Sequence, residues 1–208
     1  MHLPLAPRVM LHVALAVIPW WPNGEGLQPL YALKLELLAD GQVVDCEQRT
    51  VGFKHVEWHA CAGAPAGADP WLCVVNGRPV FLQGVNYPPV LPNWADVTRE
   101  QHRKLLVTYR DLGVNVLRIN ACGYLESGDF YDLCDEMGLL VWQEFPLTSS
   151  GVENTPPSDP RSIGEMSDIA RSFIARRQHH ASLLMWGGGN ELLDKDMKPY
   201  DLGHPMLA

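Results

Sequence analysis

Asn190 and Glu191 are the residues best suited to chemistry, because they follow a short apolar segment and three glycines at positions 183–189. The apolar segment predicts a buried strand, and the glycines end it. Barrel enzymes place their catalytic groups at the C-terminal ends of such strands. A carboxylate in that position can act as a general acid and base. Asn190 and Glu191 are therefore the first candidates for an active site.

Both residues also suit a purely structural position. The helix dipole would stabilise Glu191 at the start of a helix, and Asn190 would serve well as the cap of a turn. The elements around them must decide between these alternatives.

Strands and helices are predicted to alternate from residue 79 onward. Thr98 and Gln101 match a capping box at the start of one predicted helix, and Gly113 and Gly138 follow two predicted helices as stop signals. Such alternation predicts a parallel sheet, and four strand-helix units are half of an eightfold barrel. The predicted strands are residues 79–86, 114–119, 139–144 and a segment from 183, and the predicted helices are residues 98–112, 127–137 and 163–177.

Polar residues mark the C-terminal ends of all four predicted strands. A doubly wound sheet would also fit the alternation of strands and helices. Polar groups repeated at one end of the sheet favour the (β/α)8 barrel, whose loops build the active site at that end. The residues are Asn86, Arg118, Glu144, Asn190 and Glu191.

The first sixty residues show a different pattern, with short segments that alternate apolar and polar residues. Pro22-Asn23-Gly24 and Asp40-Gly41 separate these segments, which predicts antiparallel strands joined by turns. We expect strands at residues 13–18, 31–37, 42–45 and 51–57. The predicted fold class is multidomain β plus α/β. Residues 1–60 form a partial β-sandwich, residues 61–70 a linker, and residues 71–208 the first four units of a barrel.

Composition excludes several functional classes. The 208 residues carry a formal charge of −8, with 16 basic and 24 acidic residues, which argues against binding to nucleic acid or to an anionic membrane. No segment is apolar enough for a membrane span. The five cysteines lack the spacing of zinc or redox motifs, so we expect no metal and no cofactor. Irregular, unpaired cysteines weakly favour a reducing compartment.

The N-terminus imitates part of a signal peptide, since Arg8 precedes the apolar residues 9–18. His12 interrupts this apolar run, and no cleavage site of small residues follows at a suitable place. We therefore expect no signal peptide and weakly favour the cytoplasm.

Nine segments carry a resemblance to glycoside hydrolase family 2, and within it to the β-mannosidases. They run in the family's order over nearly the whole chain. The resemblance implies an immunoglobulin-like sandwich followed by a catalytic barrel. We expect this chain to contain the end of the sandwich and the first half of the barrel. The segments are residues 20–24, 28–31, 49–53, 75–80, 84–87, 115–118, 130–138, 141–145 and 186–191.

The resemblance implies a role for each residue of the candidate site. Glu191 matches the general acid/base of a retaining glycosidase, and Asn190 matches the residue that binds the sugar's 2-hydroxyl. Retaining enzymes need a second carboxylate as nucleophile, roughly 5 to 5.5 Å from the first, and we expect this chain to lack it. Arg118 can hold a carboxylate as a bidentate, charge-assisted pair. In the family this arginine lies near the nucleophile, and a missing partner would leave its charge unmet.

Three further expectations concern substrate contacts. At the position of Glu144, β-mannosidases more often have aspartate, and β-galactosidases have a glutamate that helps to bind magnesium. For Glu144 we favour a contact with the sugar, or a contact with a residue that binds the sugar, over magnesium binding. Trp142 and Trp186 could stack on a pyranose ring, or belong to the core. Asn86 completes the expected substrate-binding set.

Substrate and activity stay partly open. Residues 119–124 depart from the tryptophan and glycines usual after the arginine in β-mannosidases, so β-galactosidase and β-glucuronidase specificities remain alternatives to removal of terminal β-D-mannose. The expected partner is a β-linked saccharide. An open half-barrel also exposes sheet edges, so we expect possible self-association. A catalytically inactive fragment that binds a sugar or a partner chain is the remaining alternative.

Overall fold

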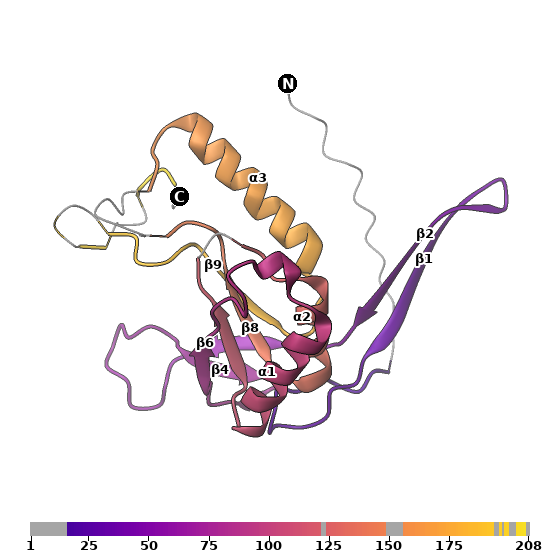
Figure 1. Ribbon diagram of the computed structural model, residues 1–208. Coiled ribbons are helices and arrows are strands. Elements are labelled where there is room, and N and C mark those ends of the chain that lie inside the picture. The colour runs from indigo at the N-terminus through magenta and orange to yellow at the C-terminus, as the bar shows by residue number, and fades with distance from the viewer. Residues whose placement is uncertain are drawn as a thin grey trace.

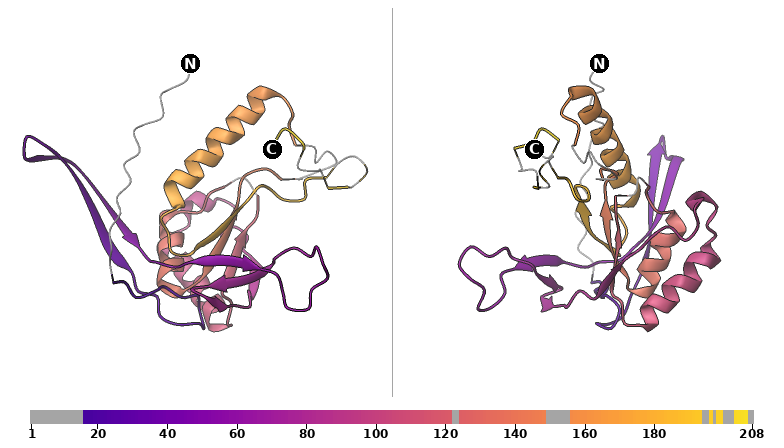
Figure 2. Two further views of the ribbon diagram at one scale, coloured as in Figure 1. Left: turned by 180° about the vertical axis from the view of Figure 1, so that it is seen from behind. Right: turned by 60° about the vertical axis from the view of Figure 1, so that its left-hand side comes forward.

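The computed structural model describes residues 16–121, 124–148, 156–193, 196, 198–199 and 203–206. A parallel four-stranded sheet forms its centre, with the strands in chain order. Helices cover one face of this sheet, and a small antiparallel sheet lies on the other side (Figures 1 and 2). The four parallel strands are β6 (Gly84–Asn86), β7 (Val116–Ile119), β8 (Leu140–Glu144) and β9 (Leu183–Gly187).

The remaining strands form two antiparallel sheets. β1 (Tyr31–Ala39) and β2 (Gln42–Val51) make a hairpin that projects from the body (Figure 1). β3 (Val56–His59), β4 (Leu72–Val75) and β5 (Arg78–Pro79) form the small sheet.

α1 and α2 begin and end close to the local signals that predicted them. Thr98 and Gln101 form the capping box of α1 (Arg99–Asp111), and Ser127 caps α2 (Gly128–Met137), which ends at Gly138 with φ +76°. α3 (Pro160–Arg177) starts three residues earlier than predicted, because Asp159 caps it and Pro160 fits its first turn. A short 3₁₀ helix, η1 (Trp94–Asp96), precedes α1.

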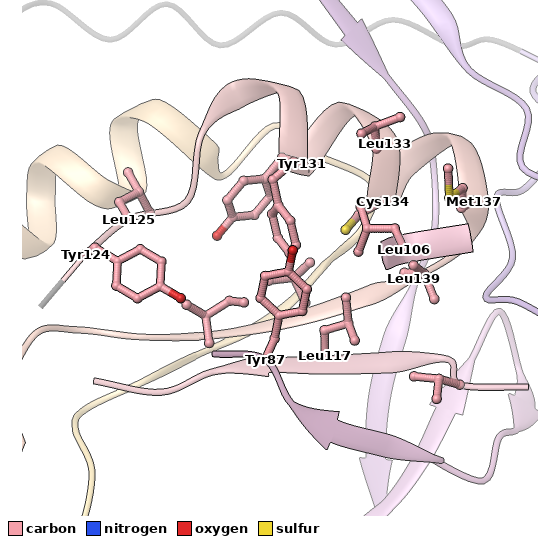
Figure 3. Close-up of a cluster of buried hydrophobic side chains, with 14 of the residues drawn as sticks. Tyr87, Leu106, Leu117, Tyr124, Leu125, Tyr131, Leu133, Cys134, Met137 and Leu139 are labelled. Carbon is pink, nitrogen blue, oxygen red and sulfur yellow. The ribbon is translucent and has the colours of Figure 1, made fainter. Parts of the chain in front are cut away.

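The main core lies between the parallel sheet and the helices α1 and α2. Alternate residues of β7 and β8 point into it, among them Leu117, Ile119 and Val141, and they meet Leu106 and Phe130 of the helices. Figure 3 shows Leu106 and Leu117 among the side chains packed between the two layers. The opposite face of the sheet carries Val116 and Leu140 against Trp20 and Ala181. The two faces of the sheet thus have separate partners.

Two predicted strands are shorter or divided in the structure. Residues 51–57 are not one strand, because β2 ends at Val51 and the chain turns into the body. There the partly buried Lys54 donates hydrogen bonds to the carbonyl groups of Ala181 and Leu183. Residues 79–86 are divided into β5 and β6. Between them, the side chain of Asn115 bonds to the N–H of Gln83 and to the carbonyl of Phe81.

The N-terminal region differs from the predicted sandwich in the parts described. Residues 16–18 are not in a strand, and the rest of the strand predicted at 13–18 lies outside the described residues. The hairpin exposes apolar side chains such as Leu35, Leu37 and Val44. The expected linker, residues 61–70, has neither helix nor strand and joins β3 to β4, which pair with each other. The strands on its two sides therefore share one sheet, and a domain boundary there remains a prediction.

Within the described residues, no helix combines the length and apolar character needed to cross a membrane.

Candidate active site

Arg118 lies at the centre of a group of polar side chains at the C-terminal ends of the parallel strands. Its Nε and Nη2 donate to Glu144 Oε1 at 2.8 and 2.6 Å. Nη1 donates to Asn86 Oδ1 at 3.1 Å, and Nη2 also donates to Asn190 Oδ1 at 2.6 Å. Parallel pairing sets Asn86 opposite Arg118 and Arg118 opposite Trp142. Four of the residues expected at the site are therefore joined directly.

Glu144 is almost fully buried, with 2% of its surface exposed. Its Oε1 takes both bonds from Arg118, and its Oε2 accepts the backbone N–H of Ala121 at 2.9 Å. Arg118 is therefore paired with a carboxylate that the next strand supplies, and its charge is not left unmet. Among the described residues, the group of side chains that could hold a metal ion is Asp132, Asp135 and His180, and Glu144 is not part of it.

Glu191 follows this network and is exposed. Its backbone is left-handed, with φ +49°, a conformation that is uncommon for residues other than glycine. The preceding residue fixes the loop, because Asn190 N–H donates to the carbonyl of Leu147 at 2.9 Å, and residues 148 and 190 form an isolated parallel bridge. Held in an unusual conformation at a strand end, Glu191 is a reasonable candidate for function.

The two tryptophans expected to contact substrate lie on opposite faces of the sheet. The guanidinium carbon of Arg118 lies 5.1 Å from the ring centroid of Trp142, so this tryptophan belongs to the site. Trp186 packs against the core under the helices and stacks on Phe145, with ring centroids 5.3 Å apart. A register irregularity at Trp142 pairs Trp186 with Gln143, which puts it on the helix-facing side. Trp186 therefore does not join the other site residues.

A cavity of about 620 Å³ adjoins Asn86, Arg118 and Trp142. It continues to Trp58 and Trp71, two residues that no sequence pattern singled out. They flank residues 61–70, and only the pairing of β3 with β4 brings them together, with ring centroids 6.0 Å apart. The cavity walls are mostly apolar, with a few polar groups at one end, as in many ligand sites.

His179 and His180 precede β9 and lie at the opposite end of the parallel sheet from Arg118. His180 Nδ1 is 2.8 Å from Asp135 Oδ2, and Asp135 Oδ1 accepts the N–H of Ser182 at 2.6 Å. Burial, followed by the charge of His180, lowers the pKa of His179 to about 4. These bonds hold the start of β9 in place, and they give His180 and Asp135 a structural explanation.

Known proteins match this chain over most of its length. Residues 70–201 match the family model described as glycosyl hydrolases family 2, TIM barrel domain. The chain is 31% identical over 186 residues to β-mannosidase of Capra hircus, covering 88% of this chain and 20% of that protein. The crystal structure of β-D-mannosidase from Dictyoglomus thermophilum has a TM-score of 0.73 at 32% identity, covering 83% of this chain and 20% of that one.

A β-glucuronidase structure from Parabacteroides merdae has a TM-score of 0.66 at 23% identity, covering 89% of this chain and 20% of that one. This likeness is one of fold alone. The chain spans about a fifth of the length of the relatives it matches.

Proposed function

The chain belongs to glycosyl hydrolase family 2, and from this we propose that it supplies the acid/base part of a retaining β-glycosidase that removes terminal β-D-mannose. Its parallel sheet and helices are then part of the family's TIM barrel domain. The observation that carries the proposal is the network on Arg118, which gathers three strand ends beside Asn190 and Glu191. The names of two relatives at about a third identity favour mannose.

In this mechanism Glu191 protonates the leaving oxygen and later takes a proton from the attacking water. The amide of Asn190 binds a sugar hydroxyl, and Trp142 and Asn86 line the space where the sugar lies. The nucleophilic carboxylate comes from outside these residues. Glu144 supports the site through Arg118 and does not touch the sugar.

Hydrolysis of the 4-nitrophenyl β-mannoside, β-galactoside and β-glucuronide tests both activity and sugar preference. Because the nucleophile comes from outside these residues, we expect little or no turnover by the chain alone. Any release should favour the mannoside and be lost in Glu191→Gln, because glutamine cannot transfer a proton. If the galactoside or the glucuronide were preferred, that sugar would replace mannose as the assigned substrate. Turnover that survives Glu191→Gln would contradict the role of Glu191.

The larger architecture is also a proposal. We propose that residues 1–60 are the end of an immunoglobulin-like sandwich and that the hairpin β1–β2 needs further strands to cover its exposed apolar residues. The edges of the parallel sheet, β6 and β9, would then pair with further barrel strands or with a second copy of the chain. Light scattering after size-exclusion chromatography tests whether a second copy of the chain pairs with these edges. A monomeric mass would exclude that pairing.

A further inference from the structure

We infer that Glu144 is a positioning residue, which orients Arg118 and, through Arg118, the side-chain amide of Asn190. The importance of this for catalysis rests on the proposed function, but the coupling itself is a property of the folded chain. None of the hydrogen bonds described joins Glu144 directly to Asn190, and Arg118 is the side chain that hydrogen-bonds to both of them.

Glu144 is placed so that it can only act through its neighbours. It is 2% exposed, and each of its oxygens already accepts hydrogen bonds, Oε1 from Arg118 and Oε2 from Ala121 N–H. Glu144 is not among the residues that line the cavity, and its Oε1 already accepts two hydrogen bonds. Glu144 also ties the loop after β7 to the end of β8, since Ala121 follows β7 by two residues.

Arg118, held by Glu144, in turn orients the side-chain amides of Asn86 and Asn190. A guanidinium carries only donors, so the atom of Asn190 that lies 2.6 Å from Nη2 must be the oxygen. The same reasoning assigns the oxygen of Asn86 to Nη1 at 3.1 Å. Each amide must then turn its NH2 group away from Arg118. The NH2 group of Asn190 lies 3.5 Å from Thr148 Oγ1, too long for a strong bond, and is available to donate to a ligand.

The reach of Glu144 is also set by packing. A Cβ on Gly187 would lie 2.7 Å from Glu144 Cγ, so the side chain runs directly over the backbone of β9. Aspartate, one methylene shorter, would not reach both Arg118 and Ala121 N–H from the same backbone position. Glutamine has the right length but offers one acceptor in place of two and no charge.

The test measures Asn190 after a change at Glu144. The side-chain ¹H–¹⁵N signals of Asn190 and Arg118 are assigned from Asn190→Asp and Arg118→Lys, then followed in Glu144→Gln and Glu144→Asp. We expect the Asn190 NH2 signals and the Arg118 Nε–H signal to shift in both variants while the backbone spectrum stays that of a folded chain. Glu136→Gln is the matched control, because Glu136 also binds an arginine, Arg99, at 2.7 Å, but on the exposed side of α2.

Two results would overturn the inference. One is an Asn190 amide that keeps its wild-type signals in a folded Glu144→Gln or Glu144→Asp chain. The other is an equal shift in Glu136→Gln, which would show a general response to the loss of a carboxylate.

A titration with methyl β-D-mannopyranoside connects the coupling to function. We expect Glu144→Gln to weaken binding by about fivefold or more, the effect of losing one well-oriented hydrogen bond, and Glu136→Gln to leave it unchanged. If the wild-type chain does not bind the mannoside, the proposed function fails, while the coupling is still decided by the Asn190 signals.

Discussion

At the scale of single residues, the Arg118–Glu144 pair decides how the site is held. The carboxylate is buried, whereas about a quarter of the Arg118 side chain is exposed. Burying a carboxylate is costly without its partner, and breaking such a pair from one side costs several kcal/mol. The pair therefore sets the shape of the site more than it adds to stability.

Arg118→Met should lower the free energy of unfolding by about 3 kcal/mol, because it leaves Glu144 buried without a countercharge. Adding Glu144→Met should recover part of this loss, since the uncompensated carboxylate is then gone. Urea denaturation of the two single variants and the double variant measures the coupling between them. Losses that simply add in the double variant would contradict a direct interaction.

The sequence predicted that the polar residues of the candidate site lie together, but it did not predict which of them form hydrogen bonds with each other. Parallel strands bring their C-terminal ends together. The residues at or near these ends are Asn86, Arg118, Glu144 and Asn190. Which carboxylate would neutralise Arg118 depends on side-chain reach across two strands, and no sequence pattern encodes that reach.

At the scale of elements, the lack of a side chain at Gly187 of β9 leaves room for the Trp142 and Glu144 side chains of β8. Gly187 lies directly beneath Trp142 and Glu144, and a Cβ there would be 2.7 Å from Trp142 Nε1 and from Glu144 Cγ. Both side chains must shift if Gly187 gains a side chain.

Gly187→Ala should destabilise the chain by roughly 1 to 3 kcal/mol, the usual cost of overpacking. Gly188→Ala is the matched control, because an added Cβ there meets nothing within 4 Å, and its effect should stay within about 0.5 kcal/mol. Thermal or urea unfolding of the two variants gives the comparison. Equal stabilities would show that β8 and β9 are not packed in this way.

The boundaries of α1 and α2 were predictable, whereas the start of α3 and the details of the strands were not. Caps such as Thr98 and Gly138 act within a few residues of the chain, so the sequence carries the whole signal. The division of residues 51–57 depends on Lys54 reaching the carbonyls of Ala181 and Leu183. The face taken by Trp186 depends on a register irregularity one strand away. Both depend on contacts between distant parts of the chain.

At the scale of the whole molecule, the core beneath the helices contains an ionisable group that links stability to pH. Burial raises the pKa of Glu126 to about 7, although the N–H of Ser127 and the charge of Arg177 oppose the shift. His102 Nε2 lies 3.7 Å from its carboxylate, and burial lowers the pKa of His102. The Glu126 carboxyl group thus keeps its proton in the folded chain at pH values where the unfolded chain has lost it.

Stability should therefore change with pH in a way that Glu126→Gln removes. The folded pKa is raised, so the contribution of Glu126 is complete below about 4.5 and disappears as the pH rises through about 7. Between pH 5 and 8, wild type should lose roughly 2 to 3 kcal/mol relative to Glu126→Gln. The lowered pKa of His102 has the opposite effect, because it makes the folded chain less stable as the pH falls. Both wild type and Glu126→Gln contain His102, so comparing their urea denaturation curves reduces this contribution.

Exposed Glu100 at the start of α1 provides the control. Glu100→Gln should keep the pH dependence of wild type. Parallel curves for wild type and Glu126→Gln would contradict a buried, protonated Glu126.

The most direct test of Glu191 as an acid/base group without its own nucleophile uses phenyl β-D-mannoside with sodium azide. Azide would attack the anomeric carbon as the bond to phenol breaks, and Glu191 would give its proton to the leaving oxygen, so that the products are α-mannosyl azide and phenol. We predict phenol release that rises with azide and is lost in Glu191→Gln. Release that is independent of azide, or equal in wild type and Glu191→Gln, would contradict the assignment of Glu191.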